Sequence, residues 1–402
     1  MKVDLEVRDL ALEQNAPSGN LHVFVLIDAL GWAVLEGQQF LNDALPFRQP
    51  VRTVLGFSSG AIPTILTGVP PALNGHWNLF YYDPKHSPFR WLKWFGFLPD
   101  SVLNHRVSQK LIKELGRHVL GMGPLFECCV TPRLLPWFNW VEKRNIYGPG
   151  GISGAPSIFD QLAERKLPYR VYSYHHAKDE DILRQAQRDI EAQAASFYFV
   201  YLCEFDSVLH NNIGDQEKLK ARLDWYATGL TQILRAARQI DPQAQMTLFS
   251  DHGMTPVSSR FDLVREIEQL GFSMPGDYLA VYDSTMARFW FFSAQARAGI
   301  TGKLKSLTCG RILPDAELQK LGVFFPDRRY GEMVFLLEPG CLIAHSDFNG
   351  KGWDPIGMHG YHPDDPYSDG VLLSSHRPPA PVRTVADVYH CLQQAIVPAR
   401  NR

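Results

Sequence analysis

Apolar runs of strand length alternate with amphipathic helical segments along most of this chain. The strand-like runs lie at residues 22–27, 51–57, 169–173, 197–202, 245–250 and 371–374. The helical segments lie at residues 59–67, 157–165, 179–195, 216–239 and 385–396. Continuous apolar runs are typical of parallel strands that are covered on both faces. The alternation therefore predicts an α/β fold, a three-layer sandwich around a mostly parallel, doubly wound sheet.

Two stretches do not follow the alternation. Residues 85–150 are rich in aromatic residues and proline, and we expect them to form an inserted cap. Their aromatic side chains could stack on a base or hold a lipid tail, although a small hydrophobic core of the cap is the simpler explanation. Residues 260–345 are predicted to form a second insertion that partly extends the sheet. Both would belong to one catalytic domain spanning residues 1–402.

Charge and hydropathy exclude several classes of partner. The 402 residues carry a formal net charge of −2, with 20% charged residues spread along the chain, so no nucleic-acid groove is expected. No run of apolar residues is long enough to cross a bilayer, and residues 1–19 lack the apolar core of a signal peptide. The six cysteines form no regular frame. We therefore expect a cytoplasmic protein without a transmembrane segment.

Candidate metal ligands follow two of the strand-like runs directly. Asp28 ends the first run, where a buried carboxylate is costly unless it is paired or bound to a metal. Its alternative role is to cap the next helix. Asp251 and His252 end the run at residues 245–250, and Gly253 permits a turn through which both could reach one ion. Because such strands place their carboxyl ends at one edge of the sheet, these side chains should meet there.

Three further candidates lie near strand ends. Asp206 and His210 are one helical turn apart on one face, just after the run at residues 197–202. A surface ion pair would have the same spacing. His359 lies in a loop between glycines, which allow close approach to an ion. Carboxylate with imidazole suits zinc or manganese.

A serine pair opens the helical segment that follows residue 57. The hydroxyl of Ser58 or Ser59 would lie near backbone N–H groups at the positive end of a helix dipole, where a phosphate binds well. A neighbouring divalent cation would make such a hydroxyl nucleophilic at neutral pH. A simple N-cap is the alternative. Together, the five segments supply ligands for two cations with one serine turned toward the substrate, an arrangement suited to in-line displacement at phosphorus.

The order and spacing of these segments resemble the alkaline phosphatase superfamily, and within it the type I phosphodiesterase/nucleotide pyrophosphatase branch. That branch has a Thr or Ser ten residues before the Gly of a Thr-Gly pair, and Thr67-Gly68 places this position at Ser58. The segment TGVPPALNGHWNLFYYDP, residues 67–84, is similar to the branch in pattern and length. The resemblance covers roughly residues 20–84, 155–256 and 355–400.

The resemblance implies a set of roles for these residues. It implies one metal site from Asp206, His210 and His359. It implies a second metal site from Asp28, Ser58, Asp251 and His252. The family usually holds zinc in both, and manganese is the alternative. Ser58 would attack phosphorus in line and form a covalent phospho-enzyme, so that a small phosphodiester or pyrophosphate, nucleotide or lipid-like, is cleaved.

The chain departs from the family pattern at two places. The branch has Thr-Phe-Pro-Asn around the nucleophile, whereas this chain has Ser-Ser-Gly-Ala at residues 58–61, so Ser59 is a second candidate nucleophile. The branch's phosphoryl-binding Asn aligns with Leu79. A bulge of one residue would let Asn78 serve in its place.

Two other functions are compatible with the same core. A phosphomonoesterase, or a phosphonate or sulfate ester hydrolase, would place a cationic side chain on the terminal oxygens of its substrate. Its candidates are Arg52, Lys85, Arg90 and Arg288. A metal-bound binding protein without turnover is the second alternative, although binding alone does not require the serine. The sequence predicts neither the substrate nor the oligomeric state.

Overall fold

The computed structural model describes residues 21–95, 97–103, 105–119, 130–173, 177–347 and 353–396. A six-stranded sheet lies at its centre, in the order β2-β16-β7-β1-β6-β5. The strands are β1 (His22–Ile27), β2 (Phe47–Val51), β5 (Tyr169–Tyr172), β6 (Phe197–Leu202), β7 (Gln245–Phe249) and β16 (Gly370–Ser374). Strands β7, β1, β6 and β5 are parallel, and β16 runs antiparallel to both of its neighbours. The predicted mostly parallel sheet is confirmed.

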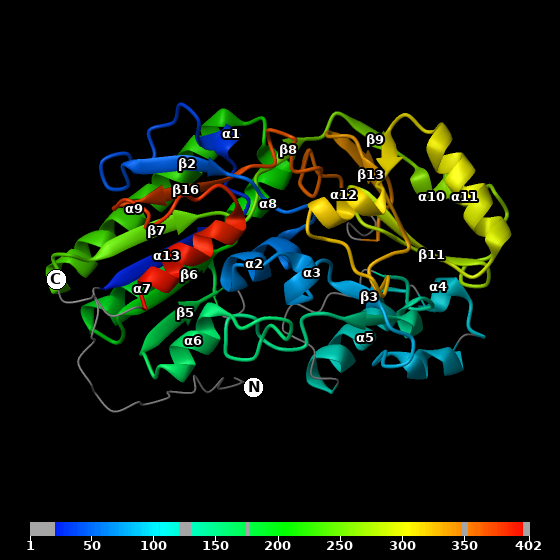
Figure 1. Ribbon diagram of the computed structural model, residues 1–402, viewed down its shortest axis with the longest axis horizontal. Coiled ribbons are helices and arrows are strands. Elements are labelled where there is room, and N and C mark those ends of the chain that lie inside the picture. Colours follow the sequence, from blue (N-terminus) through cyan, green and yellow to red (C-terminus); the bar gives the residue numbers. More distant parts are fainter. Residues whose placement is uncertain are drawn as a thin grey trace.

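Helices cover both faces of this sheet, as Figure 1 shows. Alternate residues of a strand point to opposite faces, so Val23, Val25 and Ile27 of β1 enter one core while Phe24 and Leu26 enter the other. The first core is closed by α1 (Trp32–Leu35), α7 (Asp179–Glu191), α8 (Glu204–Asn212) and α9 (Gln216–Ile240). The second is closed by α2 (Ser58–Thr67), α6 (Ile158–Glu164), η3 (Val385–Asp387) and α13 (Val388–Gln394). The result is the predicted three-layer sandwich.

The strand predicted at residues 51–57 is wrong in its position. Strand β2 ends at Val51, where it is already paired with β16, and the chain then runs as a loop to Ser58. Leu55 and Phe57 are nevertheless buried, because they pack with Trp77, whose indole N–H donates to the Leu55 carbonyl at 2.6 Å. Burial of these apolar side chains by loop packing imitates the pattern of a buried strand.

The aromatic insert, residues 85–150, folds largely as helices. It contains η1 (Arg90–Phe95), α4 (Asp100–Leu103), α5 (Arg106–His118), η2 (Leu135–Trp137) and β4 (Phe138–Trp140). Residues 96, 104 and 120–129 of this range lie outside the described residues. Strand β4 pairs with β3 (Phe80–Tyr82), which follows α3 (Pro71–Asn74). Phe89, Phe138 and Trp140 form a small core, whereas Trp94 and Phe97 are each 81% exposed.

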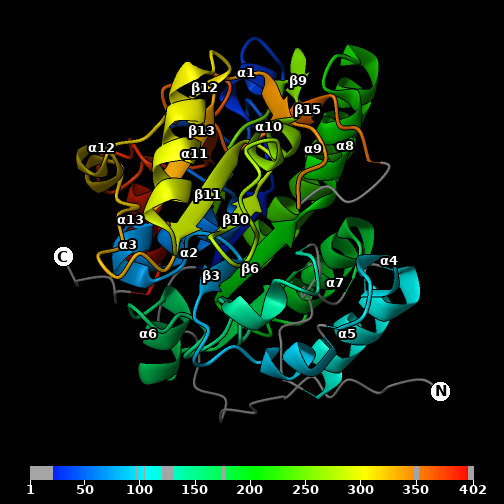
Figure 2. The same ribbon diagram turned by 90° about the vertical axis from the view of Figure 1, so that its right-hand side faces the viewer.

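The second insert, residues 260–345, builds a sheet of its own in the order β10-β11-β13-β12. The expectation that it extends the central sheet is wrong, because its short strands pair antiparallel with one another (Figures 1 and 2). Its elements are α10 (Leu263–Glu268), β10 (Tyr278–Tyr282), β11 (Met286–Phe291), α11 (Ala294–Ser306), β12 (Gly310–Ile312), α12 (Asp315–Lys320), β13 (Met333–Leu337) and β14 (Cys341–Ile343).

Two small ladders join this insert to the rest of the chain. Strand β14 pairs with β9 (Ser259–Phe261), and β8 (Thr255–Pro256) pairs with β15 (Gly357–Met358). Every helix in the described part of the chain is too short or too polar to span a lipid bilayer. The boundaries at residues 85–150 and 260–345 stay predictions of how the chain is divided.

Candidate active site

Three aspartates meet at the carboxyl end of the central sheet. Asp28 follows β1, Asp251 lies two residues after β7, and Asp206 lies in the first turn of α8, which follows β6. Strand β1 lies between β7 and β6, so these three residues come from adjacent strands. The edge predicted from the sequence therefore brings them together, with β1 in the middle.

The first group of candidate ligands consists of Asp206, His210 and His359. One ligand atom of each lies within 4.8 Å of the others. The two Asp206 oxygens face the two imidazoles, with Oδ2 lying 3.2 Å from His210 Nε2 and Oδ1 lying 3.6 Å from His359 Nε2. Both histidines are buried.

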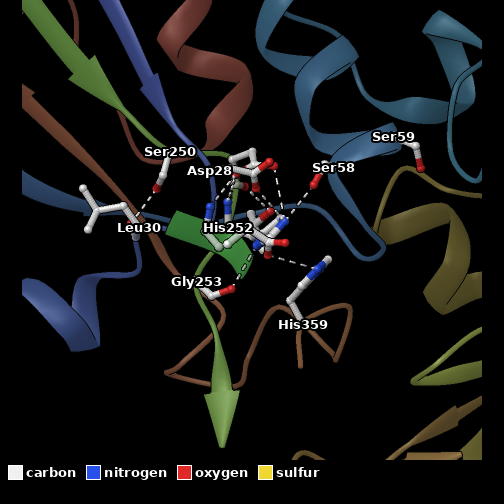
Figure 3. Close-up of polar contacts among 12 residues, drawn as sticks. Asp28, Leu30, Ser58, Ser59, Ser250, His252, Gly253 and His359 are labelled. Carbon is white, nitrogen blue, oxygen red and sulfur yellow. Dashed lines mark hydrogen bonds and ion pairs between the residues drawn. The ribbon is translucent and has the colours of Figure 1, made fainter. Parts of the chain in front are cut away.

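The second group consists of Asp28, Asp251 and His252, again within 4.8 Å of one another and all buried. His252 Nε2 lies 3.3 Å from Asp251 Oδ2 and 3.8 Å from Asp28 Oδ1. The rings of His252 and His359 stack with their centroids 3.9 Å apart, so the two groups adjoin (Figure 3). The sequence assigned the members of both groups correctly to each other, and their role as metal ligands stays a prediction.

Backbone carbonyls orient two of the imidazoles. His210 Nδ1 lies 2.7 Å from the Gly357 oxygen, and His252 Nδ1 lies 2.9 Å from the Gly253 oxygen. A carbonyl only accepts hydrogen bonds, so Nδ1 carries the proton in both rings. In the neutral ring the Nε2 lone pair then faces the carboxylates. This tautomer and this kind of support are typical of histidines that bind metals.

Several polar atoms of the two groups are buried without a hydrogen-bond partner in the described part of the chain. They are Asp28 Oδ1, Asp206 Oδ1, Asp251 Oδ2 and His359 Nδ1. Buried polar atoms without partners are rare and cost free energy. Three unpaired carboxylate oxygens beside three imidazoles are the donor set that zinc or manganese would satisfy. The residues present therefore fit two divalent cations.

The pKa values of the groups reflect this crowding. Burial, with the charges of Asp251 and Asp206, raises the pKa of Asp28 well above its ordinary value. Burial also lowers the pKa of His359 far below its ordinary value, and His252 and His210 add to the effect. Burial lowers the pKa of His210, but the hydrogen bond and charge of Asp206 outweigh it and leave that pKa raised. A bound cation would offset the repulsion among the carboxylates.

The two candidate serines point in different directions. Ser58 is the first residue of α2, and its Oγ lies 3.0 Å from His252 Nε2. The Ser59 hydroxyl donates to the Trp77 carbonyl at 3.0 Å. Figure 3 shows Ser58 facing the cluster and Ser59 lying away from it. No side chain caps the N-terminus of α2 at Phe57. The geometry therefore favours Ser58 as the nucleophile.

Asn78 lies in the same cavity as Ser58. It is buried, and its amide nitrogen has no hydrogen-bond partner among the described residues. Leu79 also lines the cavity but packs in the hydrophobic cluster of the aromatic insert. The free donor thus belongs to Asn78, as the predicted one-residue shift requires.

The cavity has a volume of about 460 Å³. Among the described residues, no lysine or arginine lines it. Arg52 pairs with Asp364 at the surface, Lys85 and Arg90 are exposed, and Arg288 is buried against Asp283. None of the four cationic candidates of the monoesterase alternative therefore reaches the cavity.

Glycine is required at two positions near the ligands. Gly360 has φ +95°, and a Cβ there would lie 2.7 Å from Thr285 Oγ1 and 2.8 Å from Phe57 Cε1. A Cβ on Gly253 would lie 2.2 Å from the Tyr367 carbonyl oxygen. The sequence attributed the role of Gly253 to a permissive turn, whereas the structure requires a glycine there for room.

Sequence reasoning missed four polar residues of the cavity. The Tyr201 hydroxyl donates to Asp28 Oδ2. Glu142, Asp283 and Asp347 line the cavity from the two inserts. Tyr201 lies opposite Leu26 in the parallel register of β6 and β1, and sequence alone does not reveal that register. The three carboxylates follow no motif that could have identified them.

Comparison with known proteins extends the geometry to a family. The model of the family described as type I phosphodiesterase / nucleotide pyrophosphatase matches residues 58–362, which is more than half of the chain. The chain belongs to this family. The type I phosphodiesterase/nucleotide pyrophosphatase family consists of metal-dependent phosphoester hydrolases. No curated protein sequence matches the chain.

Solved structures show the same fold at low sequence identity. Murine ectonucleotide pyrophosphatase/phosphodiesterase 5 has a TM-score of 0.65 at 14% identity, covering 95% of this chain and 98% of its own. Its inactive variant in complex with AMP has a TM-score of 0.65 at 15% identity, covering 95% and 97%. Phosphonoacetate hydrolase from Sinorhizobium meliloti 1021, in complex with phosphonoacetate, has a TM-score of 0.62 at 13% identity, covering 94% and 96%. These likenesses establish the fold.

Proposed function

We propose that this protein hydrolyses a small-molecule phosphodiester or pyrophosphate through a serine nucleophile and two divalent cations. The observation that carries the proposal is the position of Ser58 Oγ, 3.0 Å from His252 Nε2 and beside both groups of candidate ligands. Zinc is the metal that we expect, and manganese is the alternative. The neighbours in complex with AMP and with phosphonoacetate are compatible with a small phosphorus-containing ligand.

The two groups would each hold one cation. Asp206, His210 and His359 would hold the first, and Asp28, Asp251, His252 and Ser58 would hold the second. When bound, the cations would stabilise the charge that develops on the phosphoryl and leaving oxygens and would lower the pKa of the serine hydroxyl. Tyr201 would keep Asp28 in position through its hydrogen bond to Oδ2.

Ser58 would attack phosphorus in line from the N-terminus of α2. Its Oγ forms a bond to phosphorus as the bond from phosphorus to the leaving oxygen breaks, and water then releases the phosphoryl group from the serine. The uncapped N–H groups of α2 and the free amide of Asn78 would donate to the non-bridging oxygens. These donors strengthen the attack by stabilising the negative charge of the transition state.

The lining of the cavity favours a diester over a monoester. A monoester dianion needs cationic partners for its terminal oxygens, and no lysine or arginine lines the cavity in the described ranges. Glu142, Asp283 and Asp347 line it instead. Carboxylates disfavour a second negative charge on the substrate. We therefore expect bis-p-nitrophenyl phosphate to be a better substrate than p-nitrophenyl phosphate.

Elemental analysis and two serine variants test the proposal. We expect about two metal ions per chain and a loss of at least about 100-fold in turnover in Ser58→Ala, because the attacking oxygen is removed. Ser59→Ala is the matched control and should keep most of its turnover, because that hydroxyl donates to Trp77. Full activity of Ser58→Ala would remove the covalent mechanism. Bound metal without hydrolysis of any ester would favour the binding-protein alternative, and faster cleavage of the monoester would favour a monoesterase.

A further inference from the structure

The cavity beside Ser58 is acidic beyond what the candidate metal groups need. Five carboxylates line it, and two of them, Asp28 and Asp206, belong to those groups. The other three come from the inserts: Glu142 follows β4, Asp283 follows β10, and Asp347 lies beyond β14. Such carboxylates require a compensating partner when they are buried.

Only one of these three carboxylates has a cationic partner in the described part of the chain. Arg288 Nε lies 2.7 Å from Asp283 Oδ2, and the same guanidinium donates to the Phe80 carbonyl at 3.0 Å. Asp347 Oδ2 accepts a single bond, from the Tyr282 backbone N–H at 2.8 Å. Two carboxylates of the cavity, those of Glu142 and Asp347, are therefore without a counter-charge.

Glu142 is the less compensated of the two. Its side chain lines the cavity, the residue is only 8% exposed, and its carboxylate has no hydrogen bond or ion pair with any described residue. Burial raises the pKa of Glu142 to about 7, and burial with the charge of Asp283 raises the pKa of Asp347 to about 7. A buried polar group without a partner calls for a ligand, because its desolvation is otherwise uncompensated.

The arrangement does not suit a third metal ion. Within the described ranges, the two groups at the sheet edge are the only sets of three ligand atoms that lie within 4.8 Å of one another. The carboxylates of the inserts are therefore too dispersed to coordinate one small cation. Phe80, Tyr147 and Trp353 line the same cavity. Aromatic faces with dispersed carboxylates suit a large organic cation, which is attracted by both.

We propose that Glu142 and Asp347 form a subsite for a protonated or quaternary ammonium group on the substrate of this enzyme. The inference rests on the proposed function, because Ser58 and its neighbours would bind the phosphoryl group of the same molecule. The preferred substrate is then zwitterionic, with its anionic phosphorus at the sheet edge and its cationic group against the inserts. Glu142 and Asp347 select the substrate and do not take part in bond cleavage.

A pair of ligands that differ only in charge tests the subsite. The first is sn-glycero-3-phosphocholine, and the second is its isostere with carbon in place of the quaternary nitrogen. Both are titrated calorimetrically into metal-loaded Ser58→Ala, in which the ligand is not consumed. We expect the cationic ligand to bind at least about tenfold more tightly than the isostere. Equal affinities would overturn the proposal.

Charge-removing variants in the same background assign the effect to the two residues. In Glu142→Gln and Asp347→Asn the preference for the cationic ligand should fall toward equality, while the affinity of the neutral isostere reports that the variant is folded. Glu164→Gln is the matched control, because it removes one charge from an exposed residue of α6 and should keep the full preference. An undiminished preference in both subsite variants would also overturn the proposal.

Two further arms separate the sources of the cationic ligand from a failure of the proposed function. Phosphatidylcholine in mixed micelles replaces the soluble diester, and tighter binding of either one than of its isostere supports the subsite and identifies its source. Hydrolysis of bis-p-nitrophenyl phosphate by the native protein is measured in parallel. Normal hydrolysis with equal affinities for the isosteric pair overturns the subsite alone, whereas absent hydrolysis counts against the proposed function.

Discussion

A hydroxyl from the neighbouring strand holds the carboxylate of Asp28. The Tyr201 O–H donates to Oδ2, which leaves Oδ1 without a hydrogen-bond partner among the described residues and facing His252. Asp28 is buried beside Asp251 and Asp206, so its orientation depends on this contact more than an exposed carboxylate would. Tyr201 is therefore a positioning residue for the second metal group.

Tyr201→Phe tests this role. Removing the hydroxyl should lower the affinity of the second group for its metal by about 10–100-fold, the usual effect of losing an outer-shell partner of a ligand. Metal affinity is measured by competition with a chelator. Tyr198→Phe is the matched control on the same strand, because the Tyr198 hydroxyl bonds the backbone of residues 189 and 195. Equal affinities in both variants would show that Tyr201 does not position Asp28.

A buried histidine makes stability depend on pH. Burial lowers the pKa of His76 to about 4, whereas an unfolded histidine titrates near its ordinary value of 6.5. As the pH falls below 6.5, the unfolded state takes up a proton that the folded state does not, so stability decreases until the pH reaches about 4. Each unit of pH in this window costs at most about 1.4 kcal/mol.

His76→Gln should remove this contribution. The free energy of unfolding, measured by urea denaturation at several pH values between about 6 and 4.5, should fall less steeply in the variant than in the native protein. The difference in slope corresponds to about one proton. Parallel slopes would mean that His76 is not protected from protonation by the fold.

At the scale of elements, the loop after β15 (Gly357–Met358) places His359 through a glycine that cannot be replaced. Alanine at position 360 would combine a positive φ with contacts of 2.7 Å to Thr285 and 2.8 Å to Phe57. We expect Gly360→Ala to lower the free energy of unfolding by about 1–3 kcal/mol and to weaken metal binding at the first group. Urea denaturation and elemental analysis measure the two effects.

The control for this variant is Gly302→Ala in α11. A Cβ at Gly302 meets no atom within 4 Å, and its backbone is helical. Alanine there should stabilise the helix by up to about 1 kcal/mol, because glycine is the weaker helix former. A Gly360→Ala protein as stable and as metal-rich as Gly302→Ala would show that the loop adapts to a side chain.

The sequence was sufficient to predict the elements of the central sheet because their apolar patterns are undisturbed. It failed at residues 51–57, where Leu55 and Phe57 are buried by Trp77 in a loop. The true strand, β2, contains Pro50 and only one buried residue. An edge strand tolerates proline and exposure, so its pattern is weak. Local patterns therefore indicate burial more reliably than they indicate pairing.

The candidate ligands could be predicted for a related reason. Asp28, Asp206 and Asp251 follow strands of a parallel sheet, and topology alone places such residues at one edge. Glu142 and Asp347 lie in inserts whose position over that edge depends on tertiary packing. No spacing in the sequence carries this information, so the metal groups were predicted and the acidic wall was not.

At the scale of the whole molecule, a buried ion pair connects the two inserts. Arg288 of β11 pairs with Asp283 and donates to the Phe80 carbonyl of β3, the strand that pairs with the aromatic insert. Truncating the arginine would leave Asp283 buried and unpaired and would remove the link to β3. The walls of the cavity therefore depend on one guanidinium.

Arg288→Met should be strongly destabilising. We expect it to lower the free energy of unfolding by about 3–5 kcal/mol, because one partner of a buried pair is left without compensation. Urea denaturation measures the change. The double variant Arg288→Met with Asp283→Asn should recover part of the loss, since the stranded charge is gone. A double variant less stable than the single one would show that the pair is not the source of the effect.

The distribution of the gathered side chains along the chain has a consequence for synthesis. Asp28 leaves the ribosome early, whereas His359 emerges late, and β16, which joins β2 to the remaining strands, emerges later still. A nascent or prematurely terminated polypeptide therefore lacks both a member of the first group and a strand from within the sheet. Assembly of the centre can be completed only after nearly all of the described chain has been translated, so full occupancy by metal reports that translation reached the last strand.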